Sequence, residues 1–474
     1  MCLKRADLNR RIGGRTARWV LLTLLFCGIG IATATKLEAS PGPTATSIPK
    51  DAAVFDLKEI STFDAPDAVR TRFLFGAYAV CEAEPGANAG RDPAFQSDRP
   101  LYGSFHVGAA STEPNAGCHY RFAIDESAGP GQGYDRMYLD MNLNKDLTDD
   151  GFCRPMRDVP DKALAQVGTG VTQVCFEPIK LQIAPGDDPS PGLEVMPRLL
   201  VYANDRQYMT LMTTKARVGE IQIGGDRFTV VLGHGGGIPG WFDHPETGLY
   251  LFAANRANDR PVSSWYGGDR LMAMHRSGDA YYRLAATPSG DKLFVWPYRG
   301  PFGVLEIKAG ERSVQRASVS GSLSSKDAAI SLTDSLAGQS ASPSSSFRLP
   351  AGDYGPLLLN VTYDTLNCLM LRNRHADGLP GGRSQEGPPI YPIQIREDKP
   401  YVLDFSGKPQ VVFASPGRNH RLKPGDQLEV KAVLTDPSLD IMFRSIRKGE
   451  QLDPKVVIKR ANGEIVAEGV MPFG

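Results

Sequence analysis

The sequence predicts a mainly β protein built from several sandwich-like or barrel-like modules in tandem. Short apolar runs rich in β-branched and aromatic residues recur between Gly, Pro, Asn and Asp, as in "RFTVVL", "KLFVWPY" and "QLEVKAVL". Turn signals separate these runs about every ten residues, a spacing typical of all-β sandwiches and barrels. Long stretches with helical periodicity are almost absent. A mature chain of roughly 440 residues has room for two to four such domains.

The first 34 residues have the pattern of a secretory signal peptide. Six basic residues precede a compact apolar run from Trp19 to Ile31, and Ala32 and Ala34 provide the small-residue cleavage pattern. The apolar run is about a dozen residues long, which is too short to span a bilayer comfortably. Residues 35–50 follow as a flexible leader. We therefore expect an exported protein, periplasmic or extracellular, with no transmembrane segment in the mature chain.

The charge of the mature chain bears on its partners. The whole chain has 53 basic and 53 acidic residues, and removal of the signal peptide leaves a formal charge of about −5. No cluster of basic residues remains. A mildly acidic surface of this kind does not favour binding to nucleic acid, because such binding depends on Lys and Arg. The expected partner is a cell-surface protein or a polysaccharide.

Composition and turn signals divide the rest of the chain. A Ser-rich passage from Ser318 to Ser346 separates two β-rich regions. In the last module, a Pro-Gly-Asp turn opens an alternating run with Leu428 and Val430 on one face. Asn462-Gly463 is a strong hairpin turn signal. We predict a disulfide-containing β domain over 51–196, a second β domain over 197–317, a Ser-rich linker or edge strand over 318–346, a small β module over 347–392 and an immunoglobulin-like sandwich over 393–474.

Five cysteines remain in the mature chain. Four of them lie in its first third, and the fifth, Cys368, lies far away in an apolar run. In an oxidising compartment this arrangement predicts two disulfides and one leftover thiol. The favoured pairing is Cys81 with Cys118 and Cys153 with Cys175, although four cysteines allow three connectivities.

The segment "DMNLNKDLTDDG" contains the strongest candidate site. Oxygen-bearing side chains occupy alternate positions and match positions 1, 3, 5, 7 and 9 of a twelve-residue calcium loop. Alternate spacing brings these side chains round one ion, because the residues between them point away. The expected calcium ligands are Asp140, Asn142, Asn144, Asp146, Thr148 and Asp150.

Two features of this loop depart from the helix–loop–helix pattern. Position 6, where glycine normally permits the sharp turn, is Lys145, and position 12, normally a bidentate Glu, is Gly151. Asp149 or Asp150 would have to replace that Glu. No helical pattern flanks the loop, so it resembles calcium loops between β-strands. The alternative is a solvated acidic turn, which Asn and Asp also favour.

A second candidate site lies in the glycine-rich "LGHGGGIPGWFDHPETG". Its glycines match G-x-G-x-x-G, but Pro239 and the residues after it do not continue as the helix that a dinucleotide site requires. A transition metal or a sugar is a conceivable ligand, and a long loop between strands is the alternative. The residues in question are His234, Asp243, His244 and Glu246.

Several segments resemble a group of uncharacterised exported proteins from planctomycete-type bacteria. They are "PLYGSF", "GYDRMYLDMNLNKDLTDDG", "RLPAGDYGPLLLN", "VVFASP" and "VKAVLTDPSLDIM". The resemblance extends over nearly the whole mature chain. It implies an exported, multi-domain, β-rich protein, and it implies no catalytic residue.

The function expected from the sequence is non-catalytic. Common hydrolase signatures such as G-x-S-x-G and H-E-x-x-H are absent from the sequence. The chain is expected to bind calcium structurally and to mediate cell-surface or extracellular binding. One alternative is an extracellular hydrolase of polysaccharide or peptide, with a carboxylate pair lining a cleft. Another is a carbohydrate-binding protein with a platform of Trp241, Trp265 or Trp296.

Overall fold

The computed structural model describes the chain from residue 48 to residue 471, with internal gaps. The predicted signal peptide (1–34) and residues 35–47 of the predicted leader lie outside the described residues. The gaps are 74–75, 87–89, 109–117, 161–169, 184–192, 204–205, 236–237, 246, 255–260, 262–269, 309–316, 326–327, 333–345, 364, 372–392, 405–409, 416–420, 422–430 and 437–440.

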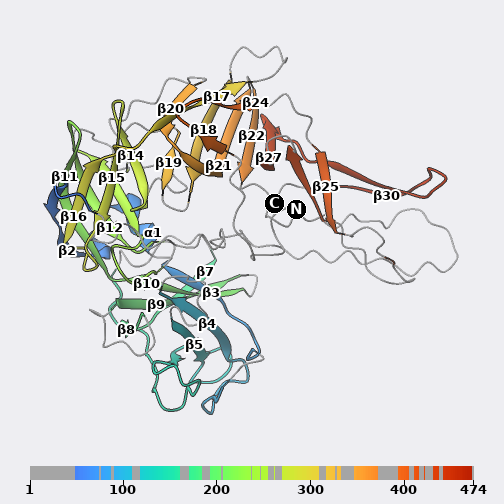
Figure 1. The fold of residues 1–474 in the computed structure, drawn as a ribbon. Helices are drawn as coiled ribbons and strands as arrows, with labels where there is room; N and C mark the ends of the chain where they lie inside the picture. The colour runs from blue at the N-terminus through green and yellow to red at the C-terminus, as the bar shows by residue number, and fades with distance from the viewer. Residues whose placement is uncertain are drawn as a thin grey trace.

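The protein is mainly β, as the sequence predicts. The described strands form six sheets, and the described helices are α1 (Asp67–Phe73) and the short 3-10 turn η2 (Thr62–Asp64). None of the described helices is long and apolar enough to cross a membrane. Three separate apolar cores lie between facing sheets, so the molecule is a series of sandwiches (Figure 1).

The first sandwich lies at one end of the molecule, below the others in Figure 1. One of its sheets contains β3 (Ala77–Val80), β10 (Gln207–Thr213), β9 (Leu193–Tyr202) and β7 (Val171–Cys175), with β8 (Ile179–Leu181) paired to β9. The facing sheet contains β4 (Leu101–Val107), β5 (Cys118–Asp125) and β6 (Arg136–Leu139). Alternate residues of these strands point inward, and Phe105, Tyr120 and Phe122 are almost completely buried between the sheets.

The second sandwich combines strands from two distant parts of the chain. One sheet contains β13 (Gly248–Ala253), β12 (Asp226–Gly233), β11 (Lys215–Ile223) and β2 (Lys58–Ser61). It packs on a sheet portion formed by β1 (Ala53–Asp56), β16 (Lys292–Pro297), β15 (Ala280–Ala286) and β14 (Ala273–Ser277). Helix α1 covers the other face of the first sheet, where Val69 and Phe73 pack against Val231 and Tyr250.

A parallel pairing of β14 with β19 (Ala329–Ser331) extends this sheet into the third sandwich. The extended sheet continues through β18 (Ala317–Ser324), β21 (Gly352–Tyr363), β22 (Leu366–Leu371), β27 (Ile441–Lys448), β26 (Lys431–Asp436) and β25 (Gln410–Ser415), with β23 (Ile393–Ile395) on β21 and β28 (Glu450–Gln451) on β27. The covering sheet contains β20 (Ser346–Pro350), β17 (Phe302–Lys308) and β24 (Tyr401–Asp404). Leu305, Leu349 and Leu359 lie in the core between them.

Strand pairing crosses the boundaries that the sequence predicts. Strand β18 of the Ser-rich passage lies inside the extended sheet between β19 and β21. The N-terminal strands β1 and β2 pair with strands of the second sandwich. The described strands of 393–474 are distributed over three sheets, which does not confirm an immunoglobulin-like sandwich there. Individual sheets therefore contain strands from more than one of the predicted modules.

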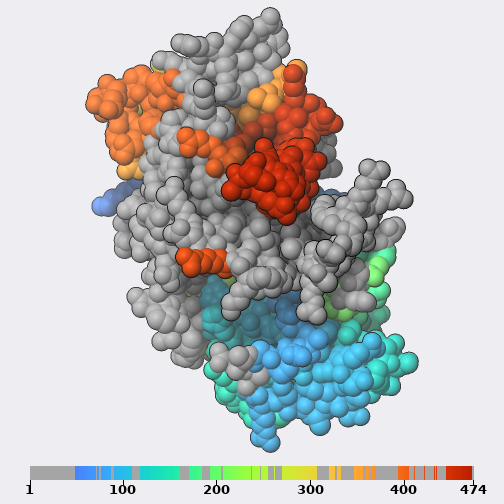
Figure 2. All heavy atoms as spheres, turned by 90° about the vertical axis from the view of Figure 1, so that its right-hand side faces the viewer, coloured from blue at the N-terminus to red at the C-terminus, as the bar shows by residue number. Residues whose placement is uncertain are grey.

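The C-terminal hairpin is confirmed. Strands β29 (Lys455–Lys459) and β30 (Ile465–Val470) pair with each other around Asn462 and Gly463, and Gly463 has a φ of 87°. The hairpin projects from the extended sheet in Figure 1 and faces the viewer in Figure 2, away from the first sandwich.

The structure contains no disulfide among the five described cysteines, so neither predicted disulfide is present in it. Strand register explains the first pair. Glu82, which follows Cys81, pairs with Tyr102, whereas Cys118 pairs with Val107 at the other end of β4. Cys81 is therefore level with Gly103, and the two cysteines are about 13 Å apart along the strand at the usual rise per residue, far beyond the Cα separation that a disulfide spans.

Strand register also separates Cys153 from Cys175. The Met156 N–H donates to the Cys175 carbonyl, which sets Met156 beside Cys175. Cys153 comes three residues before Met156 and is therefore displaced from Cys175 along the strand direction. Cys175 packs with Met196 and Met212, while Cys153 packs against the core of the first sandwich. Cysteine spacing gave no information about this register.

Candidate functional site

The acidic loop, residues 140–151, follows β6 and folds back over the outer face of the β4–β5–β6 sheet. Leu147 is completely buried there against Ala123 and Tyr138, and Phe95 and Tyr102 pack around this small cluster. The loop therefore has an apolar anchor as well as its polar side chains. Burying one leucine in this way contributes about 1.5–3 kcal/mol.

Asp140 organises the beginning of the loop. Its side chain is almost completely buried, with 1% exposure, and its carboxylate accepts hydrogen bonds from the backbone N–H groups of Asn144 (3.0 Å) and Lys145 (2.9 Å). The Asp140 N–H donates to the Arg121 carbonyl on β5 at 2.9 Å. A buried carboxylate is tolerated where donors compensate for the lost hydration. Asp140 thus ties the turn to the sheet.

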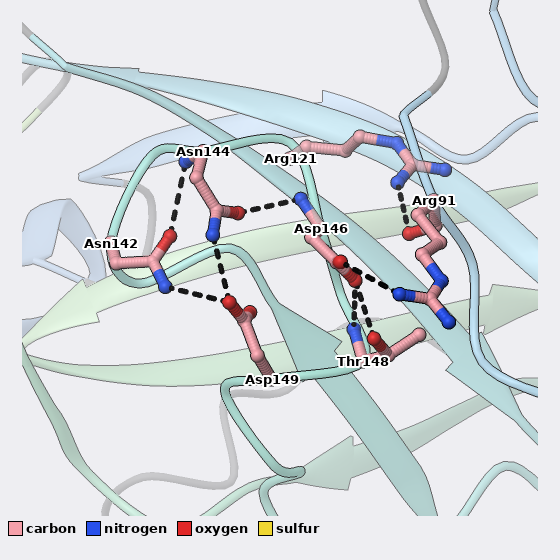
Figure 3. A network of polar contacts seen from close by, with 7 residues as sticks. All are labelled: Arg91, Arg121, Asn142, Asn144, Asp146, Thr148 and Asp149. Carbon is pink, nitrogen blue, oxygen red and sulfur yellow. Dashed lines mark hydrogen bonds and ion pairs between the residues drawn. The ribbon is translucent and has the colours of Figure 1, made fainter.

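The next polar side chains form a ladder of turns (Figure 3). The Asn142 side-chain oxygen accepts from the Asn144 N–H at 3.0 Å, and the Asn144 oxygen accepts from the Asp146 N–H at 2.7 Å. The Asp146 carboxylate accepts from the Thr148 N–H at 2.9 Å. Each oxygen therefore caps a backbone donor two residues ahead, which curls the chain into successive turns.

The sharp turn at position 6 is present although the residue there is not glycine. Lys145 has a φ of 68° and Leu143 a φ of 61°, and these are the two non-glycine residues with positive φ in the described chain. This left-handed conformation costs about 1–2 kcal/mol for a residue with a side chain. Asp140 offsets that cost through its bond to the Lys145 N–H, and Arg91 adds a bond from its own N–H to the Lys145 carbonyl at 2.8 Å.

The structure brings some predicted ligands together. The side-chain amides of Asn142 and Asn144 both donate to the Asp149 carboxylate, at 3.3 and 2.8 Å, and Figure 3 shows the three side chains converging. Asp150 accepts from the Met141 N–H at 3.0 Å. Burial raises the pKa of Asp150, and the negative charges of Asp149 and Asp140 raise it further.

Asp146 and Thr148 point elsewhere. The Thr148 hydroxyl donates to Asp146 at 2.5 Å, and the Arg91 guanidinium lies 3.5 Å from the same carboxylate (Figure 3). These bonds from Thr148, and then the Arg91 charge, lower the pKa of Asp146. Among the described residues, no three His, Cys, Asp or Glu side chains are grouped so that they could hold a metal ion.

Arg91 is a structural partner of the acidic loop that the sequence does not reveal. The Leu147 N–H donates to the Arg91 carbonyl at 3.0 Å, so residues 90–92 run beside the loop. The Arg121 side chain donates to the same carbonyl and to Asp92, which fixes this segment to β5. Some 50 residues separate Arg91 from the loop, and only the fold brings them together.

The second candidate site brings His244 close enough to His234 and to Asp243 to influence the pKa of each. Glu246 lies outside the described residues. His234 is 2% exposed and stacks on Phe242 with ring centroids 4.7 Å apart, which is the environment of a core residue. Burial, and to a smaller extent the nearby His244, lowers the pKa of His234 to about 4, and burial raises the pKa of Asp243.

A surface pocket is lined by residues of the N-terminal segment and of strands β15 and β16. None of its lining residues belongs to either predicted set, and its one carboxylate, Asp51, is paired with Arg299. Trp296 is 8% exposed, Trp241 packs against the core of the first sandwich, and Trp265 lies outside the described residues. The pocket is lined by Pro49, Asp51, Arg283, Trp296, Pro297, Tyr298 and Arg299.

Comparison of the chain with protein-family models, with curated proteins and with solved structures found no match. The site must therefore be interpreted from its own geometry and chemistry.

The buried histidines predict how stability depends on pH. Burial lowers the pKa of His234 and of His275 to about 4. Their stabilising contribution is complete above the unfolded value near 6.5 and is lost as pH falls toward 4, because the unfolded chain binds the protons. Each histidine should therefore lower the unfolding free energy by about 2 kcal/mol at pH 5 relative to pH 7.5.

The measurement is urea unfolding at both pH values for the parent and for His275→Leu. The loss of unfolding free energy between pH 7.5 and pH 5 should be about 2 kcal/mol smaller in the variant, because one buried histidine has been removed. An equal difference in both proteins would contradict the assignment of His275 as a buried, neutral residue.

Proposed function

We propose that the chain is an exported, non-catalytic β-modular protein in which calcium stabilises the acidic loop and a surface of the sandwiches contacts a cell-surface or extracellular partner. The observation that carries the calcium proposal is the turn at Asp140–Lys145. There a buried carboxylate, two alternate amide oxygens and a left-handed residue at position 6 recur in the order of a calcium loop.

The residues fit a calcium ion by their chemistry. Calcium prefers carboxylate and carbonyl oxygens and accepts irregular coordination. Asp140, Asn142 and Asn144 would hold it from one side, and Asp149 or Asp150 would replace the missing Glu of position 12. The seventh position of such loops contributes its backbone carbonyl, and the ninth often acts through water. The pairing of the Asp146 side chain with Arg91 is therefore compatible with this role.

Charge supports the same proposal. Asp140, Asp149 and Asp150 are close enough for the first two to raise the pKa of the third. A divalent cation would offset this repulsion, so its binding energy would appear as folding stability. Extracellular calcium modules bind with dissociation constants of about 0.1–1 mM. The ion would hold the loop on the β4–β5–β6 sheet and take no part in a reaction.

The remaining parts of the proposal follow from the chain as a whole. A signal peptide pattern supports export, and tandem sandwiches provide exposed surfaces for a protein or polysaccharide partner. The mature charge of about −5 argues against nucleic acid. The hydrolase alternative needs a carboxylate pair across a cleft. The described pocket offers one carboxylate, and that carboxylate is ion-paired.

Calcium should stabilise the mature protein. At about 100 times its dissociation constant it should add roughly 2.7 kcal/mol to the unfolding free energy. Asp140→Ala should abolish this gain, and Asp146→Ala should weaken it through the loss of the Arg91 and Thr148 contacts. Asp279→Ala is the matched control, because its carboxylate is 98% exposed and lies outside the loop. Thermal unfolding with calcium and with chelator measures the gain, and no shift in the parent would contradict the proposal.

Asp150→Asn should change stability in opposite directions with and without calcium. Because the pKa of Asp150 is raised in the folded protein, its charged form destabilises the fold at pH 7, and this cost disappears as pH falls below the raised pKa. The variant should therefore be more stable than the parent in chelator and should gain less from calcium. Chemical unfolding in both conditions measures the two effects. A variant that gains as much from calcium as the parent would exclude Asp150 as a ligand.

A further inference from the structure

Two histidines face each other on the sheet that supports the acidic loop. His106 of β4 is the direct antiparallel partner of His119 of β5. Both side chains are exposed, whereas the neighbouring Val107 and Cys118 point into the core of the first sandwich. Directly opposed residues of antiparallel strands have Cβ atoms about 4.5–5.5 Å apart. The backbone therefore holds the two imidazoles side by side on the surface.

The distance between the rings is short. The Nδ1 atom of His106 and the Nε2 atom of His119 are 3.2 Å apart, and the ring centroids are 4.5 Å apart with planes inclined by 51°. Two imidazole nitrogens bound to one tetrahedral zinc ion, at 2.0–2.1 Å each, lie about 3.3 Å from each other. In the structure the two nitrogens are hydrogen-bonded to each other, and the same separation suits two ligands that share one metal ion. Metal binding would displace the bridging proton and would require little displacement of the nitrogen atoms.

Among the described residues of β5, the basic side chain on the same face as His119 is Arg121. Its guanidinium is paired with Asp92 and donates to the Arg91 carbonyl, so its charge is partly compensated. Neutral imidazole is a ligand for zinc, copper and nickel, whereas calcium and magnesium prefer oxygen. This pair therefore selects a different class of ion from the acidic loop.

We propose that His106 and His119 form a two-histidine site for a divalent transition-metal ion, with zinc, nickel and copper as the chemical class. The protein supplies two nitrogen ligands, and water completes the coordination on the open side. The site is independent of the calcium proposal, because none of its ligands belongs to the acidic loop.

The test is calorimetric titration of the full mature chain with zinc chloride, repeated with nickel chloride, in calcium-free buffer. The variants are His106→Gln, His119→Gln and the double substitution. Because the second imidazole binds intramolecularly, each single variant should lose about 100-fold in affinity. The zinc affinity of the double variant should be only a little lower than that of either single variant. Both substitutions are at exposed positions, and circular dichroism verifies that the variants are folded.

The matched control is the double variant His375→Gln/His420→Gln, which changes two histidines outside the described residues. It should bind zinc like the parent. The proposal is overturned if the parent binds no zinc at millimolar concentration, in which case the pair is only a hydrogen-bonded contact. It is also overturned if either single variant retains the parent affinity, or if the control loses it.

Discussion

The buried carboxylate of Asp140 is the constraint on which the arrangement of the acidic loop depends. It accepts two consecutive backbone N–H groups and thereby holds Lys145 in a left-handed conformation that a lysine does not favour. The reversal of the chain that follows carries Leu147 back onto the outer face of the β4–β5–β6 sheet, where it is completely buried. A hydrogen-bonded charge, a strained turn and an apolar anchor thus support one another. A cation placed among the same oxygens would act on an element that is already ordered by protein contacts.

The sequence predicted those features that depend on local chemistry. Short β-branched runs between turn residues gave the fold class, Asn462-Gly463 gave the terminal hairpin, and alternate oxygens marked the loop as one unit. Features that depend on register between distant strands were not predictable. The cysteine pairing was wrong because register places Cys81 and Cys118 at opposite ends of β4. Serine content suggested a linker or an edge strand over 318–346, whereas β18 is an internal strand that lies between β19 and β21.

The candidate site likewise has features that follow from local sequence and features that depend on contacts between distant segments. The sequence identified the polar residues of the loop, but it did not show that Asp146 would turn to Arg91, whose position depends on a segment some 50 residues earlier. The histidine pair is a similar case, because nothing in the sequence sets His106 opposite His119 until the strands pair. One three-stranded sheet therefore carries an oxygen-rich loop and a nitrogen pair, and these suit hard and borderline cations respectively.

The central claim is that calcium binds where Asp140 organises the loop, and amide hydrogen exchange at Asn144 and Lys145 tests it most directly. These two N–H groups donate to the Asp140 carboxylate, so their exchange reports the opening of this turn rather than unfolding of the whole protein. Amides of β5 serve as the internal reference. The account predicts that saturating calcium slows exchange at both residues more than in β5. Equal exchange with calcium and with chelator would contradict it and would make residues 140–151 an acidic turn held by protein contacts alone.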